Sequence, residues 1–158
     1  MNKKIFGKGK IFLLLFFVVS LAVLYKNSDL RDPGVQTVST IMEIPLSRET
    51  KDEAVTMRKS SFLGDGSDAI VLKLGEEDRR NLEEQIQREG WKVPDEESWE
   101  EFQRIISDAK PLENQLGKDD FVYKWKSTNE KAGGRFWNYA MVFYSPQKEK
   151  LYYVASDS

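Results

Sequence analysis

The sequence predicts an α+β fold, in which an antiparallel sheet carries two helices on one face and follows an amino-terminal transmembrane or signal helix. Three observations support this prediction. Residues 11–25 form an apolar run, residues 76–89 are rich in helix-forming side chains, and the last third of the chain alternates apolar and polar residues as strands do.

The apolar run at residues 11–25 follows four lysines, Lys3, Lys4, Lys8 and Lys10. A bilayer-spanning helix needs about 20 apolar residues, whereas a secretory signal has a shorter run followed by small residues. Ser20-Leu21-Ala22 would permit cleavage after Ala22, but the apolar residues beyond it favour a retained anchor. Both outcomes export the remainder, because the lysine excess stays in the cytoplasm. We expect a single-pass protein of the cell membrane with its carboxyl-terminal domain outside, or a secreted protein if cleavage occurs.

This interpretation divides the chain into three regions. Residues 1–26 form the signal-anchor or signal peptide, residues 27–34 form a tether, and residues 35–158 form a single extracytoplasmic α+β domain. The tether contains Asp32-Pro33-Gly34, a sequence that favours a turn. The amino-terminal helix makes the membrane the first expected partner.

Composition argues against several functions. The chain has 24 basic and 26 acidic residues. Residues 1–26 contain five of the basic residues and none of the acidic ones. The remainder has 19 basic and 26 acidic side chains, a net charge of -7, which disfavours nucleic-acid binding. Cysteine and histidine do not occur, which excludes disulfides, a Ser-His-Asp triad and imidazole-based metal sites. We expect no catalytic residues, no cofactor and no metal site.

The first half of the domain is predicted to be mostly extended. Residues 35–46 mix β-branched and apolar side chains, which favours a first strand ending at Pro45. Residues 54–62 and 69–74 are predicted to pair as strands, because Gly64-Asp65-Gly66 between them suits a tight hairpin turn.

Two helices are predicted next. Residues 76–89 begin with acidic side chains and stop at Gly90, a common capping residue. The second helix is predicted to begin near Ser98, with a capping box in Ser98-Trp99-Glu100-Glu101. Apolar residues recur there at helical spacing, namely Trp99, Phe102, Ile105 and Ile106.

The carboxyl-terminal third is predicted to be an antiparallel meander. Residues 121–126, 136–144 and 151–155 have the alternation or the aromatic and β-branched content of strands. A loop at residues 129–134 and a turn at residues 145–148 separate them.

The loop from Gly64 to Asp68 is a candidate surface-binding site. Asp65 and Asp68 supply the hard oxygens that Ca²⁺ prefers, but the spacing does not match an EF-hand, and a plain hairpin turn is the simpler interpretation. The acidic runs at residues 95–97 and 100–101 could supply acid and base groups, or could serve solubility and the helix dipole.

Aromatic residues suggest either a binding platform for carbohydrate or peptide, or a packed core. The four tryptophans are Trp91, Trp99, Trp125 and Trp137. Among the tyrosines, Tyr144, Tyr152 and Tyr153 are expected to be the exposed, surface-binding members. Tyr152 and Tyr153 face opposite sides of a strand, so a sheet covered on one face cannot bury both.

Three short motifs resemble a group of small, uncharacterised bacterial proteins that are anchored or exported through their amino termini. The motifs are Phe62-Leu63-Gly64-Asp65-Gly66, Trp91-Lys92-Val93-Pro94 and Leu151-Tyr152-Tyr153. The resemblance covers roughly residues 60–155 and implies an exported bacterial domain without a known activity. This chain has Leu63 where a histidine is expected, so no role of that histidine transfers.

The sequence therefore favours a membrane-anchored or secreted extracytoplasmic binding module, with an envelope protein or peptide as partner, over an enzyme. One alternative is an envelope hydrolase that uses the carboxylates of Asp65 and Asp68. Another is an immunity protein that acts at the membrane.

Overall fold

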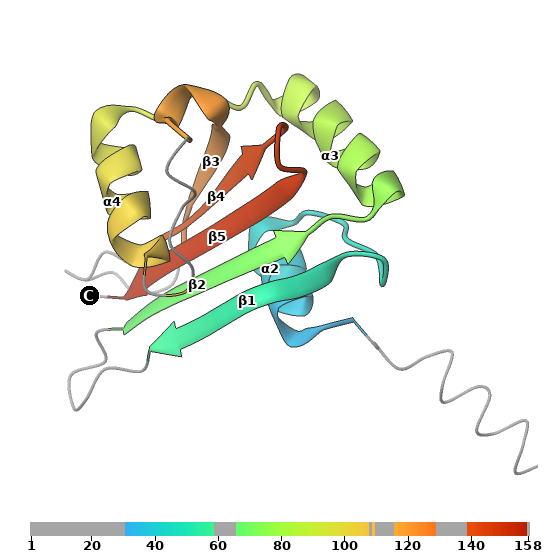
Figure 1. Ribbon diagram of the computed structural model, residues 1–158, viewed down its shortest axis with the longest axis horizontal. Coiled ribbons are helices and arrows are strands. Elements are labelled where there is room, and N and C mark those ends of the chain that lie inside the picture. Colours follow the sequence, from blue (N-terminus) through green and yellow to red (C-terminus); the bar gives the residue numbers. More distant parts are fainter. Residues whose placement is uncertain (1–30, 59–65, 108, 110–115, 129–138, 158) are drawn as a thin grey trace, which may run out of the picture. The chain divides into compact units, whose positions relative to one another are not determined.

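The computed structural model describes residues 31–58, 66–107, 109, 116–128 and 139–157 (Figure 1). The predicted signal-anchor and residues 27–30 of the predicted tether lie outside these residues. Of the helices in the described ranges, none combines the length and the apolar character that crossing a bilayer requires.

The described strands form one antiparallel sheet of five strands in the order β1-β2-β5-β4-β3. The strands are β1 (Lys51–Arg58), β2 (Gly66–Lys73), β3 (Val122–Ser127), β4 (Tyr139–Ser145) and β5 (Lys150–Asp157). This confirms the predicted α+β class and the antiparallel sheet. The predicted pairing of residues 54–62 with residues 69–74 is also confirmed by the pairing of β1 with β2. Residues 62–65 of the turn between them lie outside the described ranges.

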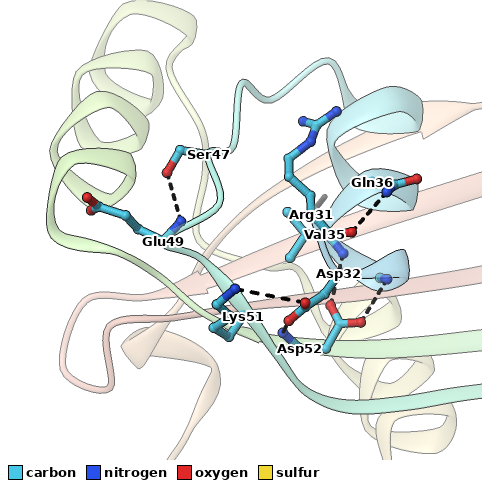
Figure 2. Close-up of polar contacts among 9 residues, drawn as sticks. Arg31, Asp32, Val35, Gln36, Ser47, Glu49, Lys51 and Asp52 are labelled. Atoms are coloured by element: carbon cyan, nitrogen blue, oxygen red, sulfur yellow. Dashed lines mark hydrogen bonds and ion pairs between the residues drawn. The ribbon is translucent and has the colours of Figure 1, made fainter. Parts of the chain in front are cut away.

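Residues 35–42, predicted as part of a strand at residues 35–46, instead form the helix α2 (Pro33–Met42), which begins in the predicted tether. Pro33 occupies the first turn, where its missing N–H costs nothing. The carboxylate of Asp52 in β1 accepts hydrogen bonds from the N–H groups of Gly34 (2.8 Å) and Val35 (2.9 Å), as Figure 2 shows. A residue from a neighbouring strand therefore caps this helix and ties it to the sheet.

The predicted helix at residues 76–89 is confirmed as α3 (Glu76–Glu89), which ends at Gly90 with φ +67°. The other predicted helix is present as α4 (Glu96–Ile106), but its predicted capping box is wrong. The carboxylate of Asp95 accepts from the Ser98 N–H at 2.8 Å, so Asp95 is the cap. Ser98 lies inside the first turn.

Helices cover both faces of the sheet, which corrects the prediction of two helices on one face. On one face, Val38 and Met42 of α2 and Leu82 of α3 are buried against the sheet. On the other face, α4 packs its buried residues against the sheet and Phe121. Those α4 residues are Trp99, Phe102, Ile105 and Ile106.

Because both faces are covered, the prediction that three tyrosines would be exposed is wrong. Tyr144 and Tyr153 lie in the core under α2 and α3, whereas Tyr152 lies under α4. All three are buried. Burial raises the pKa of Tyr144, whose hydroxyl donates to Glu83 of α3 at 2.7 Å.

A buried carboxylate fixes the start of α3. Asp78 accepts hydrogen bonds from the Ser47 N–H and hydroxyl and from the Thr50 hydroxyl. Asp78 and Thr50 are almost fully buried. Leaving either polar side chain without its hydrogen-bond partner would therefore lower the free energy of unfolding. The network joins the loop before β1 to the helix that leads to the candidate site.

Candidate functional site

The structure does not assemble the predicted site residues into one surface. Asp65 lies outside the described residues, and Asp68 lies within β2, opposite Ala155 of β5. The three tyrosines are buried. Within the described ranges, no group of three or more acidic side chains is arranged to hold a metal ion.

Three of the five acidic residues at 95–97 and 100–101 make structural contacts. Asp95 caps the helix, and Glu96 accepts from Lys118 at 2.5 Å. Glu101 pairs with Arg104 at 2.6 Å and accepts a hydrogen bond from the Tyr139 hydroxyl. Burial, reinforced by Glu101, raises the pKa of Tyr139 to about 12. These contacts tie α4 to its neighbours.

A groove of about 220 Å³ lies where the end of α3 meets the edge strand β3. The residues that line it come from two segments far apart in the sequence. They are Glu89, Gly90, Trp91, Lys92, Tyr123, Lys124 and Trp125. This groove is the candidate functional site.

One end of the groove is closed by a short backbone bridge. The Tyr123 N–H donates to the Lys92 carbonyl at 2.8 Å, and the Lys92 N–H donates to the Tyr123 carbonyl at 3.4 Å. The pairing stops there because Gly90, two residues before Lys92, donates its N–H to the Ile86 carbonyl of α3 at 2.9 Å instead of to β3. Gly90, in its left-handed conformation, directs the chain into the helix.

Beyond the bridge, no described strand pairs with the outer edge of β3. In an antiparallel pair, alternate residues direct both backbone polar groups toward the same neighbour. Tyr123 uses its groups on the outer side, so Trp125, two residues on, also directs its N–H and C=O outward, away from its β4 partner Met141. Neither group has a backbone partner among the described residues. Within the described part of the chain, the groove therefore presents a backbone donor and a backbone acceptor that other backbone groups do not use.

Two tryptophans flank this opening. The Trp125 side chain is 53 % exposed, although its neighbour Tyr123 stacks on Phe143 at 5.3 Å. Trp91 is half-buried, and its indole N–H donates to Glu89 at 3.0 Å. Val93, just beyond the bridge, is 51 % exposed. Aromatic residues are enriched in protein interfaces, so the exposed Trp125 ring is a candidate contact for a partner.

Glu89 organises the polar wall of the groove. Burial alone would raise the pKa of Glu89, but hydrogen bonds from Lys124, Trp91 and Gln85 outweigh it and lower the pKa to about 2. The Lys124 ammonium lies 2.9 Å from its carboxylate. Glu89 is therefore ionised at neutral pH and serves as an acceptor rather than a proton donor.

Most of the charged side chains at the groove and along the β3 edge, apart from Glu89, are lysines. Lys126 of β3 pairs with Glu43, the residue after α2, at 2.7 Å. Lys92 is exposed, and its ammonium has no side-chain partner in the described part of the chain. The ammonium groups of Lys92, Lys124 and Lys126 thus outnumber the carboxylates of Glu89 and Glu43.

Sequence reasoning had named Trp91 and Trp125 among the aromatic residues of a platform or a core, but had not placed them together. The signal that could have located the site is the alternation of Tyr123 and Trp125 with Lys124 and Lys126. Lysines on one face of a strand indicate a sheet edge.

Comparisons of the chain with known protein families, with curated proteins and with solved structures found no match. The functional argument accordingly rests on the groove itself.

Proposed function

We propose that this chain is an extracytoplasmic binding module, anchored in the membrane or secreted, that holds an extended polypeptide segment along the β3 edge. The observation that carries the proposal is the outward-facing backbone of Trp125 beside its exposed indole ring.

The groove suits an extended peptide better than a compact ligand. A peptide that joins a sheet edge gains backbone hydrogen bonds, and pockets along the edge recognise alternate side chains. The Trp125 N–H and C=O would supply the backbone hydrogen bonds, and the groove lined by Trp91 and Trp125 would supply a side-chain pocket. Aromatic anchors of this kind contribute most of the binding energy in many interfaces.

Binding, rather than turnover, fits the chemistry of the groove. Its one carboxylate, Glu89, has a pKa of about 2 and is already engaged by three donors. A general acid or base needs a pKa close to the operating pH. The groove is therefore suited to recognition by shape, hydrogen bonds and charge.

The proposal places the module outside the cytoplasm because of the lysine-led apolar run at residues 1–26. A strand-binding domain at that position would capture segments of envelope proteins or peptides. The acidic remainder of the chain would keep it from adhering to anionic lipid.

The test uses the full chain in detergent micelles, panned against a library of linear random peptides. We expect an enriched peptide whose affinity falls about 30-fold in Trp125→Ala, because a central aromatic anchor is lost. Trp125→Pro should weaken binding about fivefold further, because it also removes the outward N–H. Proline is tolerated there because that N–H is not used by the sheet.

The matched control is Val55→Ala, which truncates an exposed apolar side chain on β1 at the opposite edge of the sheet. It should leave the affinity unchanged, and circular dichroism should show that all three variants are folded. Equal affinity of the parent chain and folded Trp125→Pro for every enriched peptide would contradict the proposal.

A further inference from the structure

Resting on the proposed function, we infer that the segment bound at the β3 edge is an acidic strand, with glutamate or aspartate at alternate positions. The juxtaposition that points to this partner is Lys126 and Lys124 on one face of the open edge, with Lys92 at its closed end.

The two strand lysines face the same side of the sheet. Lys124 reaches Glu89 at the end of α3, and Lys126 reaches Glu43 at the end of α2. A strand added to the edge would set its own side chains opposite these positions, with Cβ atoms about 5 Å apart. Opposite charges at that distance stabilise the pair, and like charges destabilise it.

The existing partner of Lys126 can be exchanged. The Glu43 side chain is 76 % exposed, and exposed ion pairs of this kind contribute little to stability. A carboxylate on the incoming strand would therefore replace Glu43 at little cost. Lys92, which has no side-chain partner among the described residues, offers a further ammonium where the groove closes.

The same lysines disfavour the most obvious competitor, a second copy of this chain paired through β3. Such a pairing would bring Lys124 and Lys126 of one copy close to those of the other. Lysines on edge strands commonly prevent this kind of association. An acidic strand would instead be attracted by these lysines, and the two carboxylates it would approach, Glu89 and Glu43, are already paired with them.

The net charge of -7 on residues 27–158 opposes an acidic ligand only at long range. At physiological ionic strength the Debye length is about 8 Å, so distant carboxylates are screened while a contact with Lys126 is not. The lysines at the β3 edge, rather than the net charge of the domain, therefore determine which peptide charge is favoured there.

The test measures binding of three synthetic peptides to the full chain in detergent micelles at physiological salt. Each peptide alternates threonine with glutamate, glutamine or lysine. We expect the glutamate peptide to bind about fivefold more tightly than the glutamine peptide, and the lysine peptide to bind most weakly. Lys126→Glu should reverse this order, whereas Lys51→Glu on β1 at the opposite edge should preserve it. Trp125→Pro should weaken all three.

Each other outcome overturns the inference in a recognisable way. Equal binding of the glutamate and glutamine peptides, still sensitive to Trp125→Pro, would remove the acidic preference and leave the proposed function standing. The same holds if none of the three binds while a panned peptide does. Self-association of the chain that Trp125→Pro abolishes would identify a second copy as the occupant and overturn the acidic partner.

Discussion

At the scale of single residues, Gly34 shows how closely α2 approaches the sheet. A Cβ atom on Gly34 would lie 2.6 Å from the Asp52 carboxylate and 2.8 Å from the Ile70 side chain. These distances are shorter than real Cβ contacts, so a side chain at this position would displace the Asp52 carboxylate, the Ile70 side chain or the helix itself. The same carboxylate caps the helix through Gly34 and Val35.

Gly34→Ala should lower the free energy of unfolding by about 1–3 kcal/mol, because overpacking displaces the cap as well as the helix. Alanine is otherwise the better helix former, so a loss in this direction identifies the steric clash. Gly117→Ala is the control, since the nearest atom to its Cβ would be 4.0 Å away. Urea unfolding of both variants tests this; a Gly34→Ala variant as stable as the parent would show that α2 does not sit this close.

At the scale of elements, Glu89 links the end of α3 to β3 through Lys124 and holds Trp91 in place through its indole N–H. The link determines how far the α3 end stands from the strand, and hence the width of the groove. Its strength depends on the carboxylate being ionised, which makes it sensitive to acid.

The pKa of Glu89 is lowered from 4.5 to about 2 on folding, so its ionised form favours the native state. The resulting stability is present above the ordinary pKa and is lost as the pH falls from 4.5 towards about 2. Glu89→Gln should therefore unfold at lower urea than the parent chain at neutral pH, and this difference should shrink across that window.

The control for Glu89→Gln is Glu84→Gln, which changes an exposed residue of the same helix. The urea concentration at which Glu84→Gln unfolds should differ little from that of the parent chain at every pH. A Glu89→Gln difference that stays constant from neutral pH to the acid end of the window would rule out the ionised link.

The elements also show what the sequence could and could not predict. The bounds of α3 follow from local signals, its acidic start and Gly90. By contrast, the β-branched and apolar content of residues 35–46 predicted a strand, whereas the structure buries Val35, Val38 and Met42 on one face of a helix. The decisive partner, Asp52, lies in another element, so no local pattern could reveal it.

The same limit applies to the candidate site. Tyr152 and Tyr153 were expected at the surface because only one covered face was foreseen, and a helix on each face buries both. Trp91 and Trp125 were recognisable as large aromatic residues. That both line one groove depends on the bridge between Lys92 and Tyr123, a contact across distant segments that requires the fold.

At the scale of the whole described domain, helices cover both faces of the sheet and leave its edges for interactions. The β1 edge is interrupted by an irregularity between Asp52 and Ala54, and its Asp52 N–H is already bonded to Asp32 at 3.0 Å. Bulges and local bonds of this kind discourage strand addition. Among the described residues, no such bulge or bond blocks the β3 edge at Trp125, which is why we propose that edge as the binding site.

Amide hydrogen exchange of the full chain, measured with and without a panned peptide, tests the central claim most directly. The Tyr123 N–H, bonded to Lys92, should exchange slowly in both states. The Trp125 N–H should exchange rapidly in the free chain and become protected when the peptide binds. A Trp125 N–H that exchanges equally fast with saturating peptide, or that is already protected in the free chain, would contradict an open strand edge as the binding site.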